Sequence, residues 1–277
     1  MLSYRHAFHA GNFADLFKHL VLVQLIDHLQ KKPGGVFYLE THAGGGLYSL
    51  RSAEAQQNRE FADGIGRLWE AADAPPALRR YLEPVRACNP PGRLDFYPGS
   101  PLFAHYLLRP QDRMLLCDLH PAELPRLRQG FAEDQRVRVE ELDGYHALKA
   151  HLPPKDRRLL CLIDPSYEVK EEYRRVAEGL KEAHRRCATG VYALWYPLLA
   201  RRELPLMLNR VKESGIKKIL RVELWVRVPG PGMYGAGLLL VNPPWNLLET
   251  LQGVLPWLAA RLDQGGAGWI AEWMVTE

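Results

Sequence analysis

The stretch LLCLIDPSY, residues 159–167, ends an apolar run with residue types that can bind a planar amine. The Asp164 carboxylate and the Pro165 main-chain carbonyl can each accept one hydrogen of an exocyclic amine, and the Tyr167 ring can stack on the ring that carries the amine. Holding both hydrogens draws the nitrogen toward tetrahedral geometry and frees its lone pair. The motif therefore predicts a site that makes an amine nucleophilic, with Asp164 as the catalytic residue.

The same motif also has a purely structural interpretation. Asp and Pro are favoured in turns, so D-P-x-Y after a strand can be an ordinary turn. A second stretch, LLLVNPPW (238–245), is the closer match to an amine-binding N-P-P-aromatic signature. It follows the last expected strand, far from the glycine loop of the first, and it can simply end that strand before a helix at 247–262. Chain order therefore favours Asp164.

Three other strand ends carry residues that would share a crevice with the DPSY motif. The glycines at 44–46 let the backbone approach a ligand closely, although a tight turn needs them equally. Asp118 can hold the two hydroxyls of a ribose, or it can cap a helix. Asp143, before Gly144, can accept from an adenine amino group or cap the next helix. Ligands of open α/β sheets bind beyond the carboxyl ends of the strands, so these loops together predict a nucleotide-like ligand.

A dinucleotide dehydrogenase is less well supported. Its phosphate-binding loop requires G-x-G-x-x-G and an acid about 20 residues further on. Here Ser49 stands at the third glycine position, and a long intervening segment displaces the acid.

Apolar strands alternate with amphipathic helices along most of the chain. Strands that are apolar on both faces and separated by helices predict an α/β fold with a mostly parallel sheet, covered on each side. The last two strands are joined by PGPGMYGAG, which is turn material, so one strand at the end of the sheet should run antiparallel. The expected strands are 36–41, 114–119, 137–143, 159–164, 190–196, 218–226 and 237–242, and the later helices include 171–186 and 201–213.

Residues 50–95 interrupt this alternation. A strand–helix–strand crossover needs only about 30 residues, whereas about seventy separate the glycine loop from the strand at 114–119. Helical stretches at 53–70 and 77–88 predict a small helical insertion within a single domain that spans 1–277. Ahead of the first strand, Asn12 can cap a helix that ends at the glycine pair 34–35.

The overall composition sets further bounds. Lys and Arg number 36 against 32 Asp and Glu, a net charge of +4, which permits a polyanionic partner without requiring one. Basic doublets such as Arg174-Arg175 and Arg201-Arg202 favour such a partner, although each can also be a solvated helix face. Four separated cysteines lack the spacing of a zinc site, so we expect reduced thiols and no metal. No apolar run has the length of a signal peptide or membrane span, so we expect a cytoplasmic protein without a membrane partner.

Several motifs, taken in order, resemble those of the RlmJ family, bacterial adenine-N6 methyltransferases that act on large-subunit (23S) ribosomal RNA. They are MLSYRHAFHAGNFADLFKH, LETHAGGG, YPGSP, DLHP, DG, DPSY, YALWYP and NPPW, and they run from residue 1 to near the C-terminus. The resemblance implies a Rossmann-like class I methyltransferase fold with a seven-stranded sheet and a helical insertion. It also implies S-adenosylmethionine as cofactor and 23S ribosomal RNA as partner, bound before full subunit assembly by a monomeric enzyme.

The resemblance also implies roles for individual residues. Asp164 would be the catalytic acid, Pro165 and Tyr167 would hold the base, and Tyr4 matches the residue associated with the RNA substrate. Lys18, in the same amino-terminal block, is a candidate contact of the cofactor or the RNA. The expected reaction is in-line attack by the N6 amine of a flipped-out adenine on the sulfonium methyl. The implied cofactor contacts are His19, His42, Ser100, Asp118, Asp143, Gly144 and Asp164.

Two positions depart from the family pattern. Ser166 stands where the family usually has a second proline; it keeps the main-chain carbonyl but does not fix φ, so a reduced rate is one expectation. Asp118 stands where glutamate also occurs and should still reach a ribose. The motif itself does not separate this function from a DNA adenine-N6 methyltransferase or an enzyme acting on a protein glutamine amide. A catalytically weak RNA-binding module that retains the fold is a further alternative.

Overall fold

Eight strands form one continuous sheet in the structure, a computed structural model that describes residues 5–155 and 158–277. The order across the sheet is β10-β8-β9-β7-β6-β1-β4-β5. From β7 to β5 in this order, all neighbouring strands are parallel. The strand bounds are β1 Phe37–Glu40, β4 Arg113–Asp118, β5 Val137–Glu141, β6 Leu159–Ile163, β7 Val191–Leu198, β8 Ile219–Trp225, β9 Gly235–Val241 and β10 Gly268–Val275.

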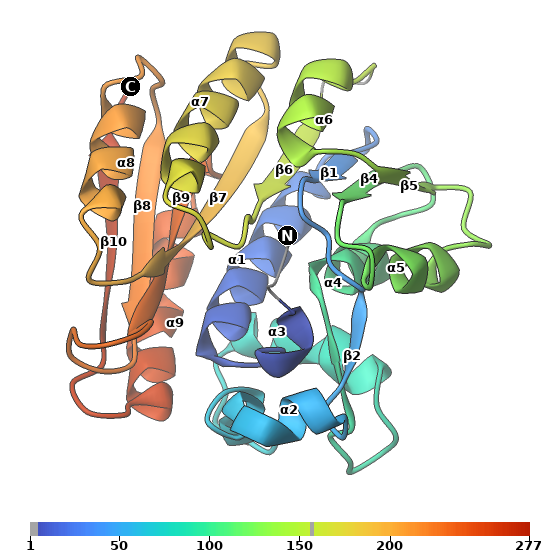
Figure 1. Ribbon diagram of the computed structural model, residues 1–277, viewed down its shortest axis with the longest axis vertical. Coiled ribbons are helices and arrows are strands. Elements are labelled where there is room, and N and C mark those ends of the chain that lie inside the picture. Colours follow the sequence, from blue (N-terminus) through green and yellow to red (C-terminus); the bar gives the residue numbers. More distant parts are fainter. Residues whose placement is uncertain (1–4, 156–157) are drawn as a thin grey trace.

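Helices cover both faces of this sheet (Figure 1). Helices α6, α7 and α8 pack on one face, and α1, α4, α5 and α9 pack on the other. All five residues of β6 are buried, which is why this strand is apolar throughout instead of alternating. Within the described residues, no helix has the length and apolar character to cross a membrane. The helix bounds are α1 Phe13–Leu29, α2 Ala53–Asn58, α3 Pro76–Ala87, α4 Ser100–Leu107, α5 Leu124–Gly130, α6 Gly144–Ala150, α7 Glu171–Arg186, α8 Glu203–Lys212 and α9 Leu247–Leu262.

The predicted antiparallel strand is β9, but it does not lie at the end of the sheet. It pairs antiparallel with both β7 and β8, so it lies between them. The strand at that edge is β10, which the sequence analysis does not predict and which pairs antiparallel with β8. Six of its eight residues are partly buried and two are exposed, so the strand lacks the alternation that marks a strand in a sequence. The sheet therefore has eight strands and not the predicted seven.

Helix α1 begins as the sequence predicts. The Asn12 side chain accepts hydrogen bonds from the main-chain N–H groups of Ala14 and Asp15, each at 3.0 Å. The helix ends at Leu29, earlier than the predicted glycine pair. Pro33 disfavours the helical region for the residue before it, which accounts for the early end. Most of α1 is buried, because it packs against α3, α4 and α9 as well as the sheet.

The segment predicted as an insertion, 50–95, holds short helices in place of the long helix expected at 53–70. Helix α2 ends at Asn58, and the next residue, Arg59, has a left-handed φ of 52°. The segment is tied to the amino-terminal block, since the Ile65 N–H donates to the Gly11 carbonyl at 2.9 Å. Its other elements are η2 Glu60–Ala62, η3 Ile65–Arg67 and α3, and a small hairpin of β2 (Leu47–Ser49) and β3 (Phe96–Pro98) flanks it.

Candidate active site

A pocket of about 620 Å³ lies beyond the carboxyl ends of β1, β4, β5 and β6. The loops that follow these four strands all contribute to its wall, as the sequence analysis predicts. Helix α1 supplies a further wall. Of the residues that the sequence singles out, those lining the pocket are Lys18, His19, His42, Gly44, Ser100, Asp118, Asp143, Gly144, Asp164, Pro165, Ser166 and Tyr167.

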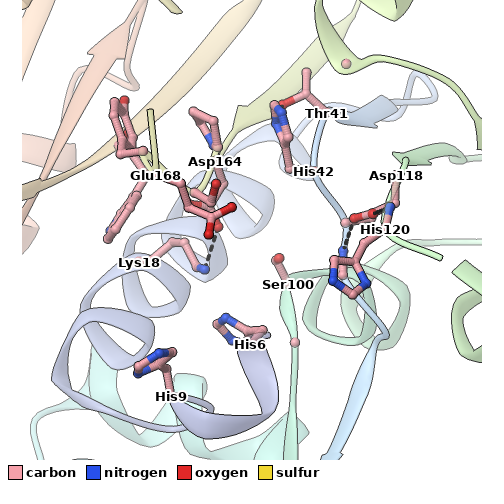
Figure 2. Close-up of a pocket in the computed structure, with 18 of the residues that line it drawn as sticks. His6, His9, Lys18, Thr41, His42, Ser100, Asp118, His120, Asp164 and Glu168 are labelled. Atoms are coloured by element: carbon pink, nitrogen blue, oxygen red, sulfur yellow. Dashed lines mark hydrogen bonds and ion pairs between the residues drawn. The ribbon is translucent and has the colours of Figure 1, made fainter. Parts of the chain in front are cut away.

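A buried ion pair joins α1 to the DPSY motif (Figure 2). The Lys18 Nζ donates to Asp164 Oδ2 at 2.6 Å, and it also lies 3.1 Å from Asp15 Oδ1. Burial works against the charge on Lys18, but the two carboxylates outweigh it and raise the pKa of the ammonium. Burial works against the charge on Asp15, but His6 and Lys18 outweigh it and hold the pKa of Asp15 well below its usual value. Asp164 therefore faces the pocket as half of a charged pair.

The rest of the DPSY motif forms a tight, largely buried turn. Tyr167 has a left-handed φ of 54° and is only 2% exposed. Its hydroxyl donates to the main-chain carbonyl of Trp195 at 2.7 Å, and its ring packs 4.7 Å from that of Tyr173. Trp195, on β7, lines the pocket beside it, and its indole N–H is buried without a hydrogen-bond partner. The structure thus places two aromatic rings next to Asp164, of which the sequence analysis names one.

Asp118 ties the end of β4 to the glycine loop (Figure 2). Its Oδ2 accepts from the Gly44 N–H at 2.7 Å, and its Oδ1 accepts from the His120 N–H at 2.6 Å. Gly44 has a left-handed φ of 64°, and a side chain there would lie 2.4 Å from the Tyr48 hydroxyl. The backbone conformation and the nearby Tyr48 therefore require glycine at this position, which also lines the pocket. Each Asp118 oxygen keeps a second lone pair for a ligand.

Asp143 caps the amino-terminal end of α6, which is one of the two roles that the sequence predicts for it. Its Oδ1 accepts from the N–H groups of Tyr145 and His146, each at 3.0 Å, and its Oδ2 pairs with Arg175 at 2.9 Å. These contacts hold the pKa of Asp143 below its usual value, although burial opposes them. At Gly144, a side chain would lie 2.4 Å from the Thr41 carbonyl oxygen. Glycine is therefore what lets the first turn of α6 approach the loop after β1.

Two histidines named by the resemblance are neutral; His19 is fully buried and His42 is partly buried. Burial lowers the pKa of His19 well below its usual value and also lowers that of His42. The His19 Nδ1 is hydrogen-bonded to the Tyr97 hydroxyl at 2.9 Å, and its Nε2 is buried without a partner among the described residues. The His42 Nδ1 lies 2.8 Å from the Thr41 hydroxyl. Buried polar atoms are usually hydrogen-bonded, so the His19 Nε2 is an exception within the described part of the chain.

Glu40 is a residue that sequence reasoning missed. It ends β1, is fully buried, and accepts hydrogen bonds from the hydroxyls of Tyr38 and Ser100. Burial raises its pKa to about 8, against the effect of these hydrogen bonds. A glutamate in an apolar strand, directly before the glycine loop, is the sequence signal that could have found it.

The rival NPPW motif lies at the other end of the strands, away from the carboxyl ends that line the pocket. Because β9 runs antiparallel to β7, its carboxyl end meets the start of β7. The Asn242 side chain donates to the carbonyls of Ala188 and Gly190, both at 2.8 Å. Trp245 is 81% exposed. Its ring therefore packs on little of the protein.

The last two predictions concern the RNA contact at Tyr4 and the absence of a metal. Tyr4, the predicted RNA contact, lies outside the described residues. Among the residues that are described, no group of three or more His, Cys, Asp or Glu side chains is arranged to hold a metal ion.

A mostly parallel sheet in this strand order, with a pocket beyond the carboxyl ends of β1, β4, β5 and β6, defines a Rossmann-like methyltransferase fold. The family model described as "Ribosomal RNA large subunit methyltransferase D, RlmJ" matches residues 33–275. The chain belongs to this family and is a methyltransferase.

Individual relatives agree along the whole chain. The "Ribosomal RNA large subunit methyltransferase J" of Escherichia coli (strain K12) is 46% identical over 280 residues, and the protein of that name from Haemophilus influenzae (strain ATCC 51907 / DSM 11121 / KW20 / Rd) is 44% identical over 281. Both alignments cover 100% of each chain. The crystal structure of protein LPL1258 from Legionella pneumophila (str. Philadelphia 1) has a TM-score of 0.90 at 37% identity, over 96% of this chain and 98% of that one. Family and fold are thus assigned together.

Proposed function

We propose that this protein transfers a methyl group from S-adenosylmethionine to the N6 amine of an adenine in large-subunit (23S) ribosomal RNA. The observation that carries the proposal is the position of Asp164 in a pocket shared with Asp118, Asp143 and the glycine loop. One end of that pocket offers carboxylates suited to a nucleoside, and the other offers an acceptor suited to an amine. The named activity of the full-length relatives supports ribosomal RNA as the substrate.

The residues of the β1, β4 and β5 side suit the cofactor. Asp118 would hold the ribose hydroxyls, and Asp143 with the Gly144 backbone would face the adenine. His19 would contribute its Nε2, which has no hydrogen-bond partner among the described residues. His42 and Ser100 line the space between these groups. When bound there, S-adenosylmethionine supplies a sulfonium methyl, which is already a good electrophile.

The task of the protein's own residues is then to align and activate the amine. The Asp164 carboxylate and the Pro165 carbonyl would accept the two amine hydrogens, leaving the nitrogen lone pair aimed at the methyl. Lys18 fixes Oδ2 of Asp164 through its 2.6 Å contact. The other carboxylate oxygen is the one available to the amine. The amine proton leaves to Asp164 or to water after attack.

The adenine must leave its helical stack to reach this site, at a cost of a few kcal/mol. Tyr167 is the ring that the motif offers for stacking, yet its low exposure in the structure means that only a small part of it meets the pocket. Trp195, which also lines the pocket, would share that role. Tyr4, which lies outside the described residues, remains the proposed RNA contact of the amino-terminal block.

Methyl incorporation from labelled S-adenosylmethionine tests the choice of substrate. Protein-free 23S ribosomal RNA, assembled large subunits and duplex DNA are compared, and the product nucleoside is identified after digestion. We expect N6-methyladenosine in protein-free RNA and less of it in assembled subunits. We also expect the enzyme to be a monomer. Methylation of duplex DNA alone would favour a DNA adenine methyltransferase. Methylation of a protein glutamine, or no methylation with cofactor still bound, would favour the remaining alternatives.

A further inference from the structure

The positively charged side chains that line the pocket differ in whether a carboxylate pairs with them. Among the described residues that line it, the lysine and arginine side chains are those of Lys18, Arg175 and Arg201. Lys18 is buried between two carboxylates. Arg175 pairs with Asp143 at 2.9 Å and lies over the Tyr145 ring at 4.6 Å from its centroid. Two of the three cations are therefore already committed within the protein.

Arg201 differs from the other two in its partners. Its side chain is exposed, as is that of Arg175, and its Nη1 donates to the main-chain carbonyl of Tyr167 at 3.3 Å. Within the described residues it forms no ion pair, and Glu203, the acid closest to it along the chain, pairs with Lys170 at 3.4 Å. The Arg201 side chain thus lines the pocket, is exposed to solvent, and is attached to the turn that carries Asp164.

We propose that Arg201 binds a backbone phosphate of the RNA next to the target nucleotide. The inference rests on the proposed function and names a positioning residue for its substrate. A base that enters the pocket at Asp164 leaves its sugar and phosphates at the rim, beside the DPSY turn. The Arg201 guanidinium has no carboxylate partner to give up among the described residues. It can bind a phosphate there through two parallel N–H···O hydrogen bonds.

The charge balance at the rim favours phosphate over a neutral group. An exposed arginine loses little hydration when it binds a second ion, whereas Arg175 would have to give up Asp143. A phosphate would therefore bind at Arg201 in preference to Arg175. This contact would hold the nucleotide without reading its base.

The test measures RNA binding and turnover for Arg201→Ala, with the protein-free 23S ribosomal RNA as probe. We expect KM for RNA to rise about tenfold near 0.1 M salt, as for loss of one charged hydrogen-bonded contact. The slope of log binding constant against log salt should become shallower by about 0.7 to 0.9, the value for one phosphate. The affinity for S-adenosylmethionine and the melting temperature should stay unchanged. Arg201→Lys, which keeps the charge, should restore most of the RNA affinity and the salt slope.

Arg210→Ala is the matched control, because Arg210 is an exposed arginine of α8 that does not line the pocket. An Arg201→Ala protein that matches this control in KM and salt slope overturns the inference. So does an Arg201→Lys protein as weak as the alanine variant, which would assign the effect to the hydrogen bond with Tyr167. A loss of cofactor affinity or of melting temperature together with activity would make the role of Arg201 structural. If the wild-type protein methylates no ribosomal RNA, the proposed function itself fails, which is a separate outcome.

Discussion

The Asp164 carboxylate has one oxygen occupied and one free. Oδ2 receives the Lys18 ammonium at 2.6 Å, and within the described residues Oδ1 accepts no hydrogen bond. A carboxylate oxygen with an unoccupied lone pair is a good hydrogen-bond acceptor. The geometry therefore suits the acceptance of an amine hydrogen better than removal of a proton before attack.

Glu40→Gln tests the buried glutamate through pH. The pKa of Glu40 in the folded protein is about 8, against the usual 4.5, so the folded state holds this proton between these values while the unfolded state releases it. Stability contributed by the protonated form is then present below about pH 4.5 and lost as pH rises toward 8, by at most about 1.4 kcal/mol per pH unit. The amide keeps both hydrogen-bonding groups and does not titrate. Urea unfolding at pH 5.5 and pH 8 should show a smaller pH effect in the variant, and equal pH effects would contradict the assignment.

Ser166→Pro tests the departure from the family motif. The Ser166 N–H donates no hydrogen bond within the described residues, so proline removes none. Fixing φ restricts the unfolded chain and should stabilise the protein by about 0.5 kcal/mol. A stiffer turn should also hold Asp164 and the following carbonyl better, so kcat should rise by less than about tenfold. Melting curves and single-turnover rates check both effects, and a drop in both would mean that serine is required here.

Strand direction is the element-scale feature that separates the two similar motifs. LLCLIDPSY ends a strand parallel to β1, whereas LLLVNPPW ends β9, which runs the other way. Two similar sequences therefore place Asp164 in the pocket and Asn242 at the other end of the strands, beside the amino end of β7. Asn242 has a left-handed φ of 52° and holds the chain before β7 through two side-chain hydrogen bonds.

Asn242→Ala should reduce stability without reducing the rate per folded molecule. Loss of two hydrogen bonds and of a residue that tolerates the left-handed region should cost about 1–3 kcal/mol. Trp245→Ala should change stability by less than about 0.5 kcal/mol, because the ring is 81% exposed. Chemical unfolding and methyl-transfer rates, normalised to folded protein, separate these effects. A lower rate in either variant at unchanged stability would return the NPPW motif to consideration.

At the scale of the whole molecule, the sequence predicts the architecture and the meeting of the loops. Apolar strands separated by helices require a buried parallel sheet, and the carboxyl ends of such strands share one edge, so Asp118, Asp143 and Asp164 had to converge. Edge strand β10 escaped prediction because its register is set by β8 and its own pattern is irregular.

Contacts between distant residues could not be predicted in the same way. Lys18 and Asp164 are 146 positions apart, and Ser100 and Glu40 are 60 apart. No local pattern specifies such pairs, because packing of α1 and α4 on the sheet creates them. Tyr167 shows the same limit, since its motif predicts a stacking ring while its burial depends on α7 and β7.

Asp164→Ala tests the central proposal most directly. The change removes the side-chain acceptor of the amine hydrogen, so transfer at saturating S-adenosylmethionine should fall by about 100-fold or more. The measurement is N6-methyladenosine formed per folded enzyme in protein-free 23S ribosomal RNA, with melting temperature and cofactor binding recorded in parallel. The account predicts a folded, cofactor-binding protein that forms almost no product. A folded variant that methylates the RNA at close to the wild-type rate would contradict it.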